Sequence, residues 1–217
     1  GSSCSGLAKG RGWLARGAGG ALANEHRSDQ AILTCGGGLQ VGLCCGQQAV
    51  DRSQLMGPPG PQLQRQWMQL LLRQAKRAGN QGEIPVAAVV LDERGRCIGW
   101  GSNRREQHSD PLGHAELLAL GQAARLRGDW RFNGCSLLVS LEPCPMCAGA
   151  LVQARMGTVI FGARDPKRGA LGSCLDLASN ASAHHHMTVI GGVFGEEASG
   201  LLASWFRRRR QQGQLRA

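Results

Sequence analysis

The sequence predicts an α/β domain: a three-layer α/β/α sandwich in which helices cover both faces of a mixed five-stranded sheet. Segments with apolar residues at helical spacing alternate with short apolar segments rich in β-branched residues. Such alternation is typical of sheets that contain parallel strands and are buried on both faces. The length of 217 residues suits one domain of this kind and is short for two.

The first predicted helix begins at Pro61. Its apolar residues recur at spacings of three and four, and Gly79 ends it. Residues 86–91 are a near-continuous apolar run, which predicts a strand buried on both faces. A turn at residues 92–95 leads into a second strand over residues 97–100, so the two strands form a hairpin.

The alternation continues in the second half of the chain. A helical run opens at His114, and residues 136–141 predict a buried strand that leads directly to Cys144. A further helical run begins at that cysteine. Residues 158–161 and 188–190 predict the last two strands, followed by a terminal helix. This order places the N-termini of two helices on one side of the sheet.

Residues 1–60 differ from the rest of the chain. They contain 14 of the 33 glycines and no sustained apolar period. We expect a largely disordered or non-native extension, with the working protein beginning near Met56 and the folded domain at residues 61–217. An organelle-targeting peptide is the alternative, because this stretch has only three acidic residues.

The composition narrows the class of protein. The formal charge of +10 and the pI of 9.8 favour a polyanionic partner such as nucleic acid, although a solvated basic face gives the same balance. Nine cysteines are an odd number, and a disulfide framework is unusual at this chain length, so we expect a reducing compartment such as the cytoplasm. No apolar stretch reaches the length of a membrane span, so we expect no membrane partner.

Two short motifs carry the chemistry: His114-Ala115-Glu116, and Pro143-Cys144-Pro145-Met146-Cys147. Imidazole nitrogen and cysteine thiolate are good zinc ligands, and a catalytic zinc site keeps three protein ligands and one water. His114, Cys144 and Cys147 are therefore the expected ligands of a catalytic Zn²⁺. Each motif falls at the first turn of a predicted helix, where positive amide ends favour thiolate over thiol. At such an open helix end Glu116 can reach the water on the metal, and it is the expected catalytic proton carrier.

Other interpretations of these residues stay open. A lone Cys-x-x-Cys is also typical of a redox pair or of half a structural zinc site. A structural site would need a fourth protein ligand, for which the candidates are Cys97, Cys135, Cys174 and His108. A structural site has no use for Glu116 or Glu142, so the combined motif favours catalysis. The run His184–His186 lies among Ser, Asn and Ala residues and is interpreted as a solvated loop.

The sequence from about residue 62 to 212 resembles the bacterial tRNA-specific adenosine deaminases, within the zinc-dependent cytidine and deoxycytidylate deaminase superfamily. The H-x-E and P-C-x-x-C motifs carry the resemblance. Further matching segments are Glu83-Ile84-Pro85-Val86, Asn103-Arg104, Asp110-Pro111, Leu141-Glu142, Ala148-Gly149-Ala150, residues 161–165 and the basic run 205–210. The resemblance implies a cytidine-deaminase-like fold and hydrolysis of adenosine to inosine at the wobble position (34) of a tRNA anticodon. It also implies a homodimer with one Zn²⁺ per subunit.

The resemblance further implies substrate contacts. Asn103 would hydrogen-bond the nucleoside, the backbone of Ala115 would read the base, Ile84 would pack on its face and Asp165 would meet flanking nucleotides. Without the resemblance, structural roles are favoured: Asn103 as a turn residue, Ile84 as a core residue and Asp165 as a helix cap. Residues 105–107 depart from the family pattern, so the resemblance implies no contacts there.

The terminal helix is expected to contact RNA. Trp205 and Phe206 precede four arginines, and aromatic surface beside guanidinium groups suits stacked bases and phosphates. Phe206, Arg207 and Arg208 are the expected contacts, and the alternative is a solvated helix end.

Two rival functions remain at this point. A deaminase of free guanine or cytidine has the same fold and nearly the same cysteine motif, but residues 148–150 and the basic helix favour an RNA substrate. A zinc module that only binds RNA needs no carboxylate beside an open zinc position, so Glu116 favours an enzyme. The sequence does not indicate which tRNAs are substrates.

Overall fold

The computed structural model describes residues 57–213, so most of the extension predicted over residues 1–60 lies outside the described part. In chain order the described elements are α1 (Pro61–Asn80), β1 (Ala87–Leu91), β2 (Cys97–Ser102), α2 (Arg105–His108), α3 (Ala115–Arg127), β3 (Ser136–Leu141), α4 (Pro145–Gln153), β4 (Thr158–Ala163), β5 (Thr188–Ile190) and α5 (Gly195–Gln211). Each predicted helix and strand has a counterpart among them. The short helix α2 has no counterpart in the prediction, because four residues are too few for a helical period.

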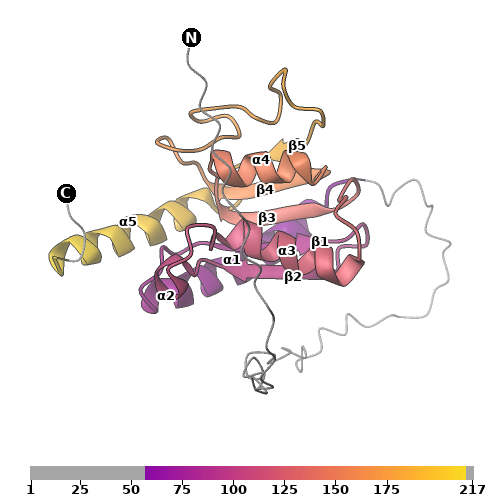
Figure 1. The fold of residues 1–217 in the computed structure, drawn as a ribbon. Helices are drawn as coiled ribbons and strands as arrows, with labels where there is room; N and C mark the ends of the chain where they lie inside the picture. Colours follow the sequence, from indigo (N-terminus) through magenta and orange to yellow (C-terminus); the bar gives the residue numbers. More distant parts are fainter. Residues whose placement is uncertain (1–56, 214–217) are drawn as a thin grey trace, which may run out of the picture. The chain divides into compact units, whose positions relative to one another are not determined.

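The five strands form one mixed sheet in the order β2-β1-β3-β4-β5 (Figure 1). Strand β1 pairs antiparallel with β2 and with β3, whereas β4 is parallel to both β3 and β5. The predicted mixed five-stranded sheet is therefore confirmed. All five residues of β1 are buried, as expected for a strand covered on both faces.

Two hydrophobic cores lie on opposite faces of this sheet, and strand β1 contributes alternate residues to each. Ala88 and Val90 pack with the alanines of α3 and with Leu151 of α4. Ala87, Val89 and Leu91 pack with one face of α1, made of Met68, Leu71 and Ala75. Alternation of side chains across a strand thus produces the predicted three layers, with α3 and α4 on one side and α1 on the other.

Helix α3 lies unusually close to β2 because two glycines of that strand face it. A Cβ atom on Gly99 would lie 2.2 Å from the Ala119 carbonyl oxygen, and one on Gly101 would lie 2.4 Å from the Ala115 carbonyl oxygen. The facing side of α3 includes three small and fully buried residues, Ala115, Ala119 and Ala123. This contact fixes the N-terminal end of α3, which holds His114 and Glu116.

The N-termini of α3 and α4 meet at one edge of the sheet. His114 is the N-cap residue of α3 and Cys144 that of α4, each with an extended backbone. The parallel strands β3 and β4 both end at this edge, which is where α/β sheets commonly hold their ligands. Among residues 57–213, no helix combines the length and apolar character that crossing a membrane requires.

Candidate active site

Three metal-binding side chains converge where α3 and α4 begin. The ligand atoms of His114, Cys144 and Cys147 all lie within 4.8 Å of one another. The Nδ1 atom of His114 lies 3.8 Å from the Cys144 Sγ and 3.5 Å from the Cys147 Sγ. Tetrahedral zinc with Zn–S near 2.3 Å and Zn–N near 2.0 Å places such ligands about 3.5 Å apart. The geometry and the chemistry of these donors therefore fit Zn²⁺.

The two thiols carry opposite shifts in pKa. Hydrogen bonds from Cys147 and His114, opposed by burial, lower the pKa of the Cys144 thiol to about 3. The pKa of Cys147 is raised by its hydrogen bond to Cys144 and by its burial. The hydrogen bond between His114 and Cys144 raises the pKa of the His114 imidazole. Cys144 is thus the thiol that ionises more readily, and a divalent cation would favour the thiolate form of both cysteines.

Glu116 lies in the first turn of α3 with only 4% of its surface exposed. Burial raises the pKa of its carboxyl group to about 7, although the His114 charge acts in the opposite sense. A carboxyl group with a pKa near neutrality can both accept and donate a proton at physiological pH. The site therefore combines metal ligands with a group suited to proton transfer.

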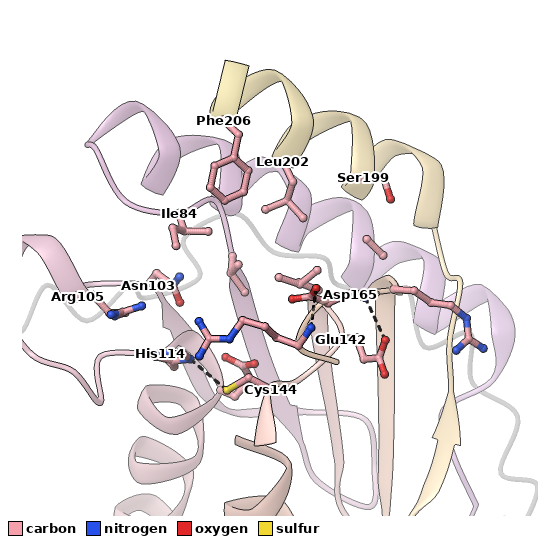
Figure 2. Close-up of a pocket in the computed structure, with 16 residues that line it drawn as sticks. Ile84, Asn103, Arg105, His114, Glu142, Cys144, Asp165, Ser199, Leu202 and Phe206 are labelled. Carbon is pink, nitrogen blue, oxygen red and sulfur yellow. Dashed lines mark hydrogen bonds between the residues drawn. The ribbon is translucent and has the colours of Figure 1, made fainter. Parts of the chain in front are cut away.

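A cavity of about 330 Å³ opens above this cluster (Figure 2). This volume is within the range of small-molecule sites. Seven of the residues expected at the site line it, drawn from six separate segments of the chain: Ile84, Asn103, His114, Glu116, Cys144, Asp165 and Phe206. Leu202 of α5 completes its apolar wall beside Phe206.

Four expected site residues do not line this cavity. The N–H group of Ala115 already donates to Asn103 Oδ1 over 3.0 Å, so it holds the Asn103 side chain against α3. Arg207 lies outside the cavity lining, and Arg208 lines a separate hollow with Trp205 and Gln212. Cys147 is fully buried beneath the cavity, within ligand distance of His114.

Glu142 has a role that the sequence does not indicate. Its carboxylate is buried and accepts hydrogen bonds from the backbone N–H groups of Asp165, Leu171 and Ser173, each over 3.1 Å, and from the Ser173 hydroxyl. Gly169 passes so close that a Cβ there would lie 2.4 Å from the carboxylate. Glu142 thus fastens the loop after β4 beside the cavity. Its position before Cys144 is visible in the sequence, but its partners lie 23 to 31 residues away.

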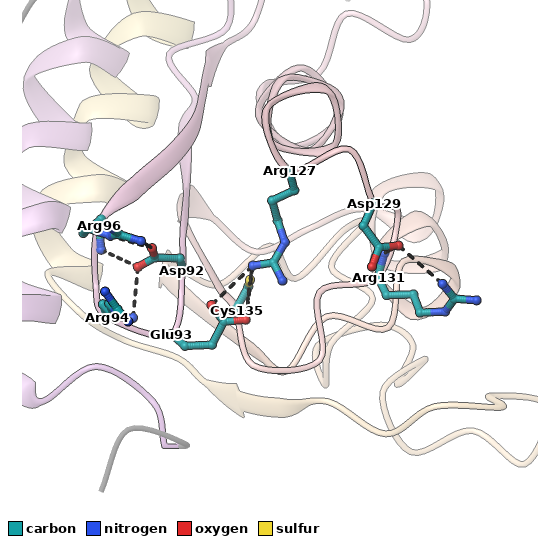
Figure 3. A network of polar contacts seen from close by, with 8 residues as sticks. All are labelled: Asp92, Glu93, Arg94, Arg96, Arg127, Asp129, Arg131 and Cys135. Atoms are coloured by element: carbon teal, nitrogen blue, oxygen red, sulfur yellow. Dashed lines mark hydrogen bonds and ion pairs between the residues drawn. The ribbon is translucent and has the colours of Figure 1, made fainter. Parts of the chain in front are cut away.

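The candidates for a fourth protein ligand lie apart from the cluster. Among residues 57–213, the group of potential ligands at this site contains His114, Cys144 and Cys147 alone. Cys135 instead accepts a hydrogen bond of 3.0 Å from Arg127 Nη1 beside Glu93 (Figure 3), and burial raises its pKa to about 12. The Cys174 thiol donates to a backbone carbonyl, and His108 is exposed.

The histidine run is not a purely solvated loop. The Nε2 atom of His185 lies 2.8 Å from the Met156 carbonyl oxygen, and His186 Nδ1 lies 3.2 Å from that of Ala178. These contacts attach the run to neighbouring backbone. None of the three histidines joins a group of metal ligands in the described part of the chain.

Comparison with known proteins places this site in a family. The model of the cytidine and deoxycytidylate deaminase zinc-binding region matches residues 61–163. The tRNA-specific adenosine deaminase of Bacillus subtilis (strain 168) is 40% identical over 146 residues, which are 67% of this chain and 90% of the relative. A solved structure from a study of A-to-I editing by tRNA:A34 deaminases shares 36% identity and a TM-score of 0.61, covering 63% of this chain and 99% of that chain.

A third relative is longer. The tRNA(Ile)-lysidine synthase of Deinococcus deserti is 38% identical over 192 residues, which are 88% of this chain and 36% of the relative. A match of that length necessarily includes residues upstream of Gly57.

Taken with the His-Cys-Cys cluster and the matching fold, the similarities to the family model and to the adenosine deaminases show that the chain belongs to the cytidine and deoxycytidylate deaminase family, on the branch of the tRNA-specific adenosine deaminases.

Proposed function

We propose that this protein hydrolyses adenosine to inosine at the wobble position (34) of tRNA. The observation that carries the proposal is the convergence of His114, Cys144 and Cys147 with the buried carboxyl group of Glu116 at one cavity. The relatives named tRNA-specific adenosine deaminase support the choice of substrate.

In the proposed mechanism His114, Cys144 and Cys147 hold one Zn²⁺ per subunit. When bound, the metal supplies a water molecule with a pKa lowered towards neutrality. Glu116 would accept a proton from the attacking water and pass it to purine N1. It would then take the remaining proton of the new C6 hydroxyl group and deliver it to the C6 amine, so that the C6–N bond breaks and ammonia leaves. The consumed water provides the oxygen at C6 of inosine.

The other cavity residues would bind and orient the nucleoside. Asn103 is fixed by the Ala115 N–H group, so its amide is preorganised for a hydrogen bond to the substrate. Ile84 and Phe206 provide apolar surface on which a purine ring can pack. Asp165, held by Glu142 through its backbone, would contact the nucleotides that flank the target.

The proposed assembly is a homodimer that acts on the anticodon stem-loop, in the compartment where tRNA is found, which we take to be the cytoplasm. Leu112 is 56% exposed and Met146 is 36% exposed, and each lies two residues or fewer from a zinc-ligand candidate. A partner subunit that packed beside the site would bury both of these apolar side chains. Sedimentation of the purified protein tests the dimer.

The decisive experiment measures inosine in a transcribed tRNA whose anticodon begins with A. Free adenosine, cytidine and guanine are assayed in parallel, and a tRNA with G at position 34 is the matched control. We expect inosine in the first tRNA alone. Faster release of ammonia from guanine or cytidine than from the tRNA would contradict the proposal and favour a free-base or nucleoside deaminase.

A further inference from the structure

Helix α2 brings to the cavity a residue for which the sequence offers no role. Arg105 opens this helix and lines the cavity together with Asn103 and His114. Its backbone is well anchored, because the Arg105 carbonyl accepts from Asp110 N over 3.1 Å and Gln107 N donates to Glu83 Oε1 over 2.9 Å. The Arg105 side chain is therefore presented from a fixed position.

The guanidinium group of Arg105 lacks an acceptor. Its Nε atom is buried without a hydrogen-bond partner, and within residues 57–213 no carboxylate lies within ion-pair distance of it. Burying a donor of a charged group without an acceptor costs free energy. We therefore expect a ligand from outside the chain to supply the acceptor. Glu83 Oε2 is also buried without a partner, so an internal ion pair is the competing explanation.

The surroundings of Arg105 favour an anionic ligand. Arg164 and Arg168 line the same cavity, and they too lack an ion-pair partner among the described residues. The Glu142 carboxylate, the nearest acidic group by sequence to Cys144, already accepts four hydrogen bonds from the loop after β4. In Figure 2, His114 and Cys144 lie between Arg105 on one side and Asp165 on the other. Three arginines thus line the cavity that contains the reacting position.

We propose that Arg105 binds the phosphodiester group on one side of the target nucleotide, across the cavity from the Asp165 loop. This inference rests on the proposed function. A nucleotide within a strand has a phosphate on each side, and a planar guanidinium group matches a phosphate with two parallel hydrogen bonds. Arg105 is then a binding determinant that restricts the enzyme to adenosine within RNA.

The test uses single-turnover deamination of an anticodon stem-loop at several enzyme and salt concentrations. Arg105→Gln is compared with Arg125→Gln, which removes an exposed positive charge from the last turn of α3, at the end away from His114. We expect Arg105→Gln to raise the half-saturating concentration about tenfold. We also expect it to flatten the slope of log affinity against log salt by about 0.7. Arg125→Gln should change neither.

Stem-loops with a neutral methylphosphonate identify the phosphate. One neutral linkage, 5′ or 3′ of the target, should reproduce the tenfold loss with the wild type and cause no further loss with Arg105→Gln. The proposal would be overturned if, at each of the two linkages, the loss caused by the neutral group multiplied with the loss caused by Arg105→Gln. It would also be overturned if Arg125→Gln changed the salt slope as much as Arg105→Gln does. It would also be overturned if Arg105 accelerated deamination of adenosine 5′-monophosphate over adenosine, because the partner would then be a mononucleotide.

Folding and function are controlled separately. Zinc content and thermal unfolding are measured for each variant. If Arg105→Gln does not fold, Arg105→Lys keeps the charge without the planar fork and should retain the salt slope with weaker binding. If the wild type forms no inosine, the proposed function fails, whereas the Arg105 contact is still decided by fluorescence titration of the same stem-loops. Equal titration curves for the wild type and both variants would show that Arg105 does not bind the RNA, without contradicting the proposed function.

Discussion

Glu116 is the residue whose substitution separates metal binding from chemistry. Its carboxyl group lines the cavity but is not one of the three converging donors. We expect Glu116→Ala to keep about one zinc ion per chain, while turnover falls by roughly 10²-fold to 10⁴-fold, the usual effect of losing a general acid and base. Metal analysis and an inosine assay measure the two quantities. Loss of zinc from this variant would instead make Glu116 a ligand.

Individual residues also show where prediction from sequence ends. His114, Glu116 and the two cysteines could be assigned because their chemistry requires a fixed local spacing. The role of Glu142 could not be assigned, because it depends on a loop that folds back from a distant part of the chain. The role of Arg105 could not be assigned either, because it depends on a side-chain atom that is buried without an internal partner. Residue type alone does not show which buried charges are satisfied.

Among the elements, α3 is the one whose position the site depends on most directly. A methyl group at Gly101 would meet the backbone of α3, whereas a Cβ on Gly200 of α5 meets no atom within 4 Å. We expect Gly101→Ala to destabilise the protein by about 1 to 3 kcal/mol and to weaken zinc binding, because α3 has to move away from β2. Gly200→Ala should instead stabilise by up to about 1 kcal/mol. Chemical denaturation and zinc titration measure both, and equal stability of the two variants would contradict the close packing of α3.

Asp92, in the turn between β1 and β2, makes the stability of the folded protein depend on pH. Asp92 Oδ1 accepts from the backbone N–H groups of Arg94 and Arg96, and Oδ2 from the Arg96 side chain (Figure 3). Burial raises the pKa of Asp92, but these hydrogen bonds outweigh it and the net shift is downward. A lowered pKa means that the stabilisation is present above the ordinary value of 3.8 and disappears as the pH falls through the folded value.

The matching test compares the wild type with Asp92→Asn. The variant should be less stable by about 1 kcal/mol at pH 7, and the difference should shrink at the lowest pH at which both proteins still fold. Urea unfolding at a series of pH values measures it. A difference that stayed constant with pH would show that the carboxylate charge contributes nothing.

At the scale of the whole molecule, metal binding and folding are coupled. The three ligand candidates join the starts of α3 and α4 across 33 residues of chain, so a bound ion links the two helices. We expect removal of zinc by a chelator to lower the melting temperature, and Cys147→Ala to do the same while abolishing metal binding. Differential scanning calorimetry measures the shift, with Cys174→Ala, whose cysteine is exposed and outside the cluster, as the matched control.

The prediction from sequence was most complete at this scale. Apolar runs and helical periods indicated every strand and long helix, because burial on both faces of a sheet leaves a continuous local signal. The mixed direction of the strands followed from the alternation of elements. The close contact of α3 with β2 was not predicted, since Gly99 and Gly101 reveal their purpose only when their neighbours are known.

The strand order has a consequence for the biosynthesis of the protein. Strands β1 and β2 form a hairpin, and β3, β4 and β5 lie beyond β1 in the same order in which a ribosome produces them. All three ligand candidates have been translated by residue 147, before β4, β5 and the arginine-rich helix α5 exist. A chain that ends after α4 would therefore carry all three metal ligands and none of the four consecutive arginines of α5.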